Sequence, residues 1–186
     1  MKTLKITAKD LDKDNYYIGT EDFSECSKKY DGNIEIEGSL GTVRFKKGIH
    51  ASYSIIANTG SGINAGWGIN AGYGISAGYG IRAGRGINAG WGISAGRGIS
   101  AGDGISAGYG VNAGYGIRAK LELSASYNIF AGTSRHIKAE GDDKKITCGK
   151  LVKGTIAYGD LVETRLPTET KEESLELLAQ LTEKLK

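Results

Sequence analysis

The stretch GYGISAGYGIRAGRGINAG, residues 72–90, repeats one six-residue unit three times with little variation. Each unit contains an Ile-x-Ala triplet with a polar middle residue, followed by a Gly-x-Gly corner with an aromatic or charged middle residue. The same register runs from Ile63 to Ala119, and only Val111 departs from isoleucine at the aliphatic position. A strict period in a glycine-rich chain is typical of a repeat architecture rather than of disorder.

The spacing within the unit predicts a β-strand. Residues two apart share one side of a strand, so Ile and Ala point together while the polar residue between them points away. A helix would need apolar residues three and four apart, and each glycine would cost it about 1 kcal/mol. The unit therefore predicts a short strand with one buried face and one solvated face. We expect the two glycines to supply the backbone freedom for a corner after each strand.

A six-residue strand and corner cannot bury its apolar face alone, but coiling the chain stacks units about 4.8 Å apart. The predicted fold is an all-β, single-domain β-solenoid (β-helix). With three units per turn, residues 18 apart stack, which places Arg85 over Asp103 and aligns the aromatic corner residues in columns. Two units per turn would set Arg85 against Arg97, an unfavourable pair of like charges. We therefore prefer three units per turn, with about seven turns over residues 32–166.

An inverted arrangement is the alternative. Glycine, serine and asparagine would then form a tight internal face, with isoleucine, alanine and tyrosine outside. Such a solenoid would expose a ladder of isoleucines over many rungs, which is a large apolar patch. We therefore favour isoleucine inside.

The repeats extend beyond the glycine-rich stretch. Ile-x-Ala triplets run over residues 49–139, with two-residue insertions at Ser61-Gly62 and Thr133-Ser134. The expected segments are an N-terminal cap at 1–30, the solenoid at 31–166 with regular repeats at 49–139, and a C-terminal amphipathic α-helix at 168–186.

The expected helix carries its own signals. Thr170 and Glu173 form a capping box, and four leucines follow on one stripe. This stripe would either fold back over the last rung or pair with a second copy or a partner. The candidate oligomerisation residues are Leu175, Leu178, Leu181 and Leu185.

In their periodicity, units such as Ile69-Asn70-Ala71 followed by Gly-x-Gly resemble the hexapeptide-repeat β-solenoids, the left-handed β-helices that include many acyltransferases. The short, glycine-separated aliphatic strands also resemble the bactofilin-like, polymer-forming solenoids. The acyltransferase pattern usually has glycine directly after the aliphatic residue and a small residue two positions before it. Here Asn, Ser or Arg follows Ile, and Ala comes two positions after. The resemblance therefore implies a solenoid fold, and no active site is carried over from it.

We expect no enzyme activity, no catalytic residues, and no cofactor or metal. Solenoid acyltransferases are expected to use a histidine as general base, and solenoid carbonic anhydrases three histidines as zinc ligands. This chain has His50, at an outward strand position, and His136, after an insertion. Cys26 and Cys148 match no metal or redox motif. The Gly-x-Gly runs lack the Lys-Ser/Thr ending of a phosphate loop.

The corners and outward strand positions carry aromatic residues and arginines. Arginine beside aromatic rings suits binding to nucleic acid or to another protein, although ladders of such residues also stack on themselves. The candidate binding edge consists of Trp67, Tyr73, Tyr79, Arg82, Arg85, Trp91, Arg97, Tyr109, Tyr115 and Arg118.

The net charge of +3 is too small to identify a partner. The chain has no signal-peptide pattern and no apolar run long enough for a membrane span, so we expect a cytoplasmic protein without a membrane partner. These features predict a non-enzymatic scaffold or binding protein that self-associates through its C-terminal helix or its solenoid ends and displays a repetitive surface. A protein would be its further partner. The alternative is a protein whose Arg/Tyr/Trp edge binds nucleic acid, another polyanion or a macromolecular machine, as an inhibitor encoded by a mobile element would.

Overall fold

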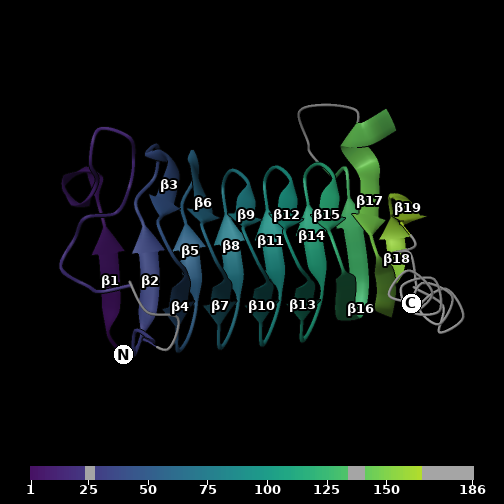
Figure 1. Ribbon diagram of the computed structural model, residues 1–186, viewed down its shortest axis with the longest axis horizontal. Coiled ribbons are helices and arrows are strands. Elements are labelled where there is room, and N and C mark those ends of the chain that lie inside the picture. The colour runs from purple at the N-terminus through teal and green to yellow at the C-terminus, as the bar shows by residue number, and fades with distance from the viewer. Residues whose placement is uncertain (24–27, 134–140, 165–186) are drawn as a thin grey trace, which may run out of the picture.

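The computed structural model describes residues 1–23, 28–133 and 141–164. Within these residues the chain forms a parallel β-solenoid whose coils stack along the long axis of the molecule, from the N-terminus to the last described strands (Figure 1). The predicted β-solenoid is confirmed. Cys26, His136 and the helix expected at 168–186 lie outside the described residues.

Each turn of the coil contributes one strand to each of three faces. Face 1 consists of β1 (Thr3–Ile6), β2 (Asn33–Ile36), β5 (Ile55–Ala57), β8 (Ile75–Ala77), β11 (Ile93–Ala95), β14 (Val111–Ala113) and the second half of β16 (Glu122–Ala131). Face 2 consists of β4 (Ile49–Ala51), β7 (Ile69–Ala71), β10 (Ile87–Ala89), β13 (Ile105–Ala107) and the first half of β16. Face 3 consists of β3 (Gly41–Phe45), β6 (Ser61–Ala65), β9 (Ile81–Ala83), β12 (Ile99–Ala101), β15 (Ile117–Ala119), β17 (Lys145–Cys148) and β19 (Asp160–Glu163).

Three further elements complete the described chain. Strand β18 (Lys150–Tyr158) pairs with both halves of β16 and so lies on faces 1 and 2. There are also two short 3-10 helices. The first, η1 (Ala8–Asp10), follows β1, and the second, η2 (Gly141–Lys144), directly precedes β17.

The strand register confirms three units per turn. On face 3, Ile63 pairs with Ile81, Ile81 with Ile99, and Ile99 with Ile117, each in parallel and 18 residues on. The next partner of Ile117 is Ile146 of β17. The triplet that begins at Ile137, counted among the regular repeats at 49–139, lies outside the described residues.

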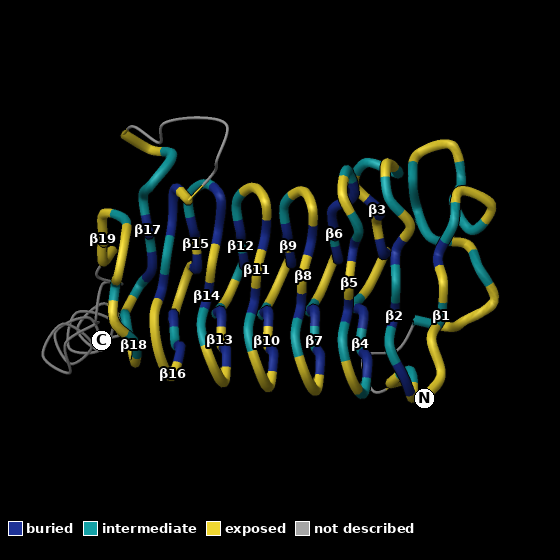
Figure 2. The backbone as a smooth tube through the Cα atoms, turned by 180° about the vertical axis from the view of Figure 1, so that it is seen from behind, coloured by how far each residue is buried: buried dark blue, intermediate teal, exposed yellow. Residues whose placement is uncertain are grey.

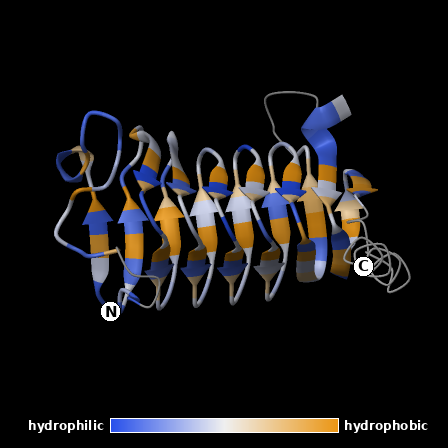
Figure 3. Cartoon of the chain, in the orientation of Figure 1, coloured by the Kyte–Doolittle hydropathy of each residue, from blue (hydrophilic) through white to orange (hydrophobic). Residues whose placement is uncertain are grey.

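The core is a set of aliphatic ladders inside the coil. The isoleucines of the triplets are almost completely buried, as Ile87 is at 0 % exposure, and the alanines are buried beside them. Figure 2 shows buried and exposed residues alternating along the strands, and Figure 3 shows apolar bands crossing each face. The inverted arrangement is therefore excluded.

The structure gives the repeat glycines a different role from the one expected. No glycine between residues 62 and 116 has a φ in the left-handed region, so the corners do not depend on glycine's backbone freedom. Instead, a Cβ added to the first glycine of a pair would meet the neighbouring rung. It would lie 1.9 Å from the carbonyl oxygen of Ser52 at Gly72, and 2.1 Å from that of Gly72 at Gly90. The first glycine is needed because the rungs approach too closely for a side chain.

The N-terminal residues cover the strand edges of β3 and β4, while β1 is itself the outermost strand of face 1. The backbone N–H of Tyr17 donates to the carbonyl of Arg44 at 2.9 Å, and Arg44 N–H donates to Asn15 at 2.8 Å, so the edge of β3 is paired. At the edge of β4, Tyr30 N–H donates to the carbonyl of His50 at 2.9 Å. Edge strands that are covered in this way cannot template further strands.

An aromatic cluster seals the same end of the coil. The rings of Tyr17 and Phe23 lie 5.3 Å apart, and both lie 5.6 Å from the ring of Phe45 on β3. Strand β1 also belongs to the coil, because it pairs in parallel with β2 along its whole length. The segment 1–30 thus contributes both a regular strand and a cover for the first rung.

Candidate binding surfaces

The outward residues of the strands form one row on each face. The face 3 row combines arginine with small polar residues and contains no acidic side chain, whereas the face 1 row has one lysine and one glutamate, and the face 2 row has one lysine. In chain order, the face 3 row is Arg44, Asn64, Arg82, Ser100, Arg118, Thr147 and Val162. The face 1 row is Lys5, Glu35, Ile56, Ser76, Ser94, Asn112, Phe130 and Tyr158. The face 2 row is His50, Asn70, Asn88, Ser106, Ser124 and Lys153.

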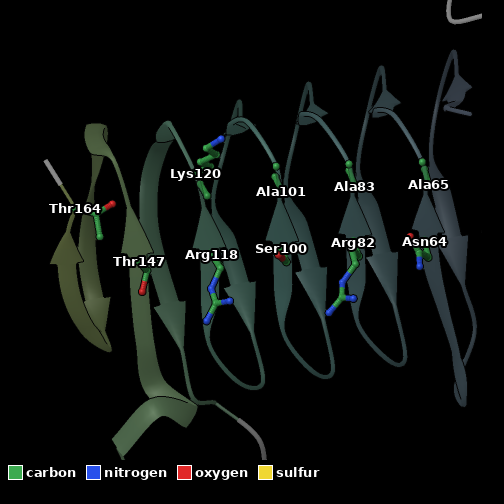
Figure 4. A pocket seen from close by; sticks show the side chains of 14 residues that line it. Asn64, Ala65, Arg82, Ala83, Ser100, Ala101, Arg118, Lys120, Thr147 and Thr164 are labelled. Carbon is green, nitrogen blue, oxygen red and sulfur yellow. The ribbon is translucent and has the colours of Figure 1, made fainter. Parts of the chain in front are cut away.

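Face 3 is also hollowed. Two shallow grooves run along it and share Arg82, Ser100 and Arg118 among their lining residues. Figure 4 shows the two guanidinium groups pointing away from the strands to the same side, with Ser100 between them. Both arginines are exposed. The grooves and the basic row therefore form one continuous surface.

Each corner of the coil carries a column of stacked side chains. Between faces 3 and 2, the Arg85 guanidinium lies 5.0 Å from the centre of the Trp67 ring. Between faces 1 and 3, the Arg97 guanidinium lies 4.3 Å from the centre of the Tyr79 ring. These contacts are cation–π interactions, which hold both arginines against the coil.

The third corner, between faces 2 and 1, carries an aromatic column. Trp91 and Tyr109 stack with ring centroids 5.2 Å apart and an interplanar angle of 3°. Tyr109 and Tyr127 lie 4.6 Å apart, and Tyr53 and Tyr73 lie 5.9 Å apart. The predicted column of residues 18 apart is confirmed. Because this corner joins faces 1 and 2, it lies across the coil from face 3.

The ten residues of the predicted binding edge therefore occupy four places rather than one. Arg82 and Arg118 are on face 3 itself. The two corners that bound face 3 hold five more, namely Trp67, Arg85, Tyr79, Arg97 and Tyr115. The remaining three, Tyr73, Trp91 and Tyr109, are on the opposite corner.

Sequence reasoning missed other members of these rows and columns, among them Lys47, whose ammonium group lies 5.5 Å from the centre of the Trp67 ring, and three residues that extend the predicted set. Arg44 begins the face 3 row, and Tyr53 and Tyr127 extend the aromatic column at both ends. Tyr127 follows Tyr109 by 18 residues, and Tyr53 precedes Tyr73 by 20 because of the two-residue insertion between them. The period, carried past the glycine-rich stretch, would have found both tyrosines.

One predicted stack has a different partner. Arg85 and Asp103 are neighbours at their corner, where the backbone N–H of Asp103 donates to the carbonyl of Arg85 at 3.3 Å. Their side chains form no ion pair, because the guanidinium lies over Trp67 of the previous rung instead. The neighbour relation is confirmed, and the attraction between opposite charges is replaced by a cation–π contact.

His50 and Cys148, which the sequence analysis considered as possible catalytic or metal-binding residues, both have pKa values that are shifted mainly by burial. Burial, and secondarily the charge of Lys29, lower the pKa of His50 below its ordinary value. Burial, and secondarily the charge of Glu163, raise the pKa of the Cys148 thiol, which therefore stays protonated at neutral pH. Among the described residues, no group of three His, Cys, Asp or Glu side chains is placed to hold a metal ion.

The C-terminal end of the coil differs from the covered N-terminal end. Leu151, Ile156 and Leu161 are the inward residues of the last described turn, one on each face. We call these three residues the end plate. Leu161 remains 38 % exposed, although Ile146, on which it stacks, is at 0 %.

No described strand pairs with the outer edges of the strands at this end. Strand β19 ends the face 3 sheet, and its outer edge pairs with no other strand of the described chain. All four of its residues are exposed, including Val162, and Val152 of β18 is exposed as well. An open edge beside exposed aliphatic side chains is a surface that can pair with another chain.

No helix in the described part of the chain is long and apolar enough to cross a membrane. No protein-family model, curated protein or solved structure matches this chain.

Proposed function

We propose that this protein is a non-enzymatic scaffold of the hexapeptide-repeat type that self-associates through the C-terminal end of its coil and displays its repeated faces. The observation that carries the proposal is the contrast between the two ends. Residues 15–17 and Tyr30 pair with the strand edges at the N-terminal end. At the other end, Leu161 of the end plate and the rest of β19 are exposed, and Leu151 and Ile156 are only partly buried.

A second copy of the chain fits the open end by its own symmetry. Two end plates that face each other across a twofold axis would bring aliphatic residues against aliphatic residues, in an isologous interface. The edge strands of the two copies would then meet in antiparallel orientation. Because the edges of β3 and β4 are covered at the opposite ends and only the four-residue strand β1 is an edge strand there, growth is expected to stop at a dimer rather than continue into a filament. The two coils of the dimer would extend in opposite directions from the interface, and each coil would display its own three faces.

Light scattering coupled to size-exclusion chromatography tests this assembly. We expect the full chain to run as a dimer, and Leu161→Lys to run as a monomer because it places a charge in the end plate. Ile18→Lys is the matched control, since Ile18 is 59 % exposed near the covered end and receives the same charge. This control should remain a dimer.

A chain that ends at Pro167 separates the two routes to self-association. If the end plate carries the interface, this shorter chain still dimerises. A monomeric shorter chain, together with a dimeric Leu161→Lys variant, would move the interface to residues beyond 167 and contradict the proposal. A monomeric full chain would overturn self-association altogether.

A further inference from the structure

We propose that face 3 binds double-stranded nucleic acid through the phosphate backbone, without reading the base sequence. The surface consists of the outward row from Arg44 to Thr147 and the two grooves along it. This inference goes beyond the assembly proposed above and does not depend on it.

The first argument is the state of the two central arginines. Arg82 and Arg118 make no hydrogen bond, ion pair or cation–π contact with any described residue. By contrast, Arg85 and Arg97 lie over aromatic rings at the neighbouring corners. Two exposed guanidinium groups on one face, each with all its donors free, suit an anionic partner.

The second argument is the regular spacing of the row. Arg82 and Arg118 are two rungs apart, which is about 9.6 Å at the usual strand spacing, and Arg44 lies two rungs before Arg82. Double-stranded DNA carries about one negative charge per 1.7 Å of axis. A straight row of arginines meets such a dense line of charge at any register, so it needs no base sequence.

The third argument is the composition of the rest of the row. Asn64, Ser100 and Thr147 occupy the positions beside the arginines. Arginine, asparagine, serine and threonine are side chains that donate hydrogen bonds to phosphate and sugar oxygens. Protein interfaces rely instead on buried aromatic and aliphatic anchors, and the row has no such residue before Val162 at its end. The row therefore favours a nucleic acid over an acidic protein.

The fourth argument favours a duplex over a single strand. Single strands are held largely by bases that stack on free aromatic rings. Of the three rings at the corners that bound face 3, Trp67 and Tyr79 already carry the guanidinium groups of Arg85 and Arg97, which leaves Tyr115 alone without a stacked cation. The free stack of Trp91 and Tyr109 lies on the opposite corner. What face 3 offers is charge and hydrogen bonding, which a duplex backbone uses in full.

The test is fluorescence anisotropy of a labelled 20-base-pair DNA duplex, titrated with the full chain at several salt concentrations between 50 and 200 mM. We expect binding that weakens steeply with salt, as phosphate contacts require. The double variant Arg82→Gln/Arg118→Gln should weaken binding about tenfold or more at 50 mM salt. Its log–log salt slope should be smaller by about 1.8, because each lost phosphate contact removes about 0.9.

The matched control is Lys2→Gln/Lys5→Gln, which removes the same charge at β1, away from face 3. This variant should bind within about twofold of the unchanged chain, and circular dichroism should show that both variants keep the fold. Equal weakening by the two double variants would mean that net charge alone attracts the duplex, and would overturn the proposal. Absence of duplex binding at 50 mM salt would also overturn it.

Two competitors identify the chemistry of the ligand. Poly-glutamate at the same concentration of charge should displace little duplex, because a carboxylate chain lacks the phosphate geometry that the row is proposed to fit. Efficient displacement by poly-glutamate would favour an acidic polypeptide and contradict the proposal. A 20-nucleotide single strand that binds more tightly than the duplex would likewise contradict it, in favour of base stacking.

Discussion

Replacing the first glycine of a corner pair should destabilise the coil far more than replacing the second. In Gly90→Ala the new Cβ would lie 2.1 Å from the carbonyl oxygen of Gly72, whereas ordinary contact begins at 3.4 Å. The two rungs would have to separate locally by the difference, about 1.3 Å. In Gly92→Ala the new Cβ would lie 3.4 Å from the carbonyl oxygen of Gly110, already an ordinary contact. The two substitutions add the same methyl group two residues apart.

The magnitude follows from the bonds that hold these rungs together. The N–H of Gly90 donates to Ala71 at 3.1 Å, and that of Trp91 donates to Tyr73 at 3.0 Å. A separation of about 1.3 Å breaks both hydrogen bonds, at about 1 kcal/mol each. Displaced packing around the new methyl adds about 1–3 kcal/mol. We therefore expect Gly90→Ala to lower the free energy of unfolding by about 3–5 kcal/mol, and Gly92→Ala to change it by less than about 1 kcal/mol.

Urea unfolding followed by circular dichroism measures both variants against the unchanged chain. The first variant should unfold at a much lower urea concentration, while the second should unfold near the original midpoint. Two variants with equal midpoints would refute the reasoning, because the glycines would then serve a purpose common to both positions, such as backbone freedom.

Two further predictions concern the core and the response to pH. Ile87→Ala should lower the free energy of unfolding by about 2–5 kcal/mol, since it leaves a cavity in the middle of a fully buried ladder, and the same urea assay measures it. The lowered pKa of His50 means that the unfolded chain takes up a proton before the folded chain does, so stability should fall as the pH drops below about 6.5. His50→Asn should reduce this loss between pH 7 and pH 5, and an unchanged pH profile in that variant would assign the loss to other groups.

The architecture was accessible from the sequence because one spacing encodes it. Ile and Ala two apart indicate a strand with one buried side, and the choice between two and three units per turn follows from the charges at Arg85, Arg97 and Asp103. The first inference uses the positions that are the same in every unit, and the second uses the variable corner positions. A repeat makes such relations reliable, because every rung meets the same environment.

The reason for the glycines was not accessible in this way. Glycine permits a positive φ and also permits close approach, and the letters Gly-x-Gly do not say which is used. Only the distance from Gly72 to the carbonyl of Ser52 decides between them. The position of β17 could not be predicted from the repeat either. Its Ile146 stacks on Ile117, although the two residues are not separated by the regular spacing of 18.

The candidate surfaces were predicted in part. The sequence identified the arginines and aromatic residues that point outward, but grouped them as one edge. Their division between face 3 and three corners depends on which strand follows which corner, and on side-chain contacts such as Arg85 over Trp67. The end plate was also not predictable, because Leu151, Ile156 and Leu161 lie outside the regular repeats.

Amide hydrogen exchange at two protein concentrations, one below and one above the dissociation constant of the dimer, tests the central claim most directly. If two copies meet at the C-terminal end of the coil, the amides of β18 and β19 become more protected at the higher concentration, while those of β1 do not change. Protection of β19 that is independent of concentration, or a concentration-dependent gain at β1 instead, would contradict the proposed assembly.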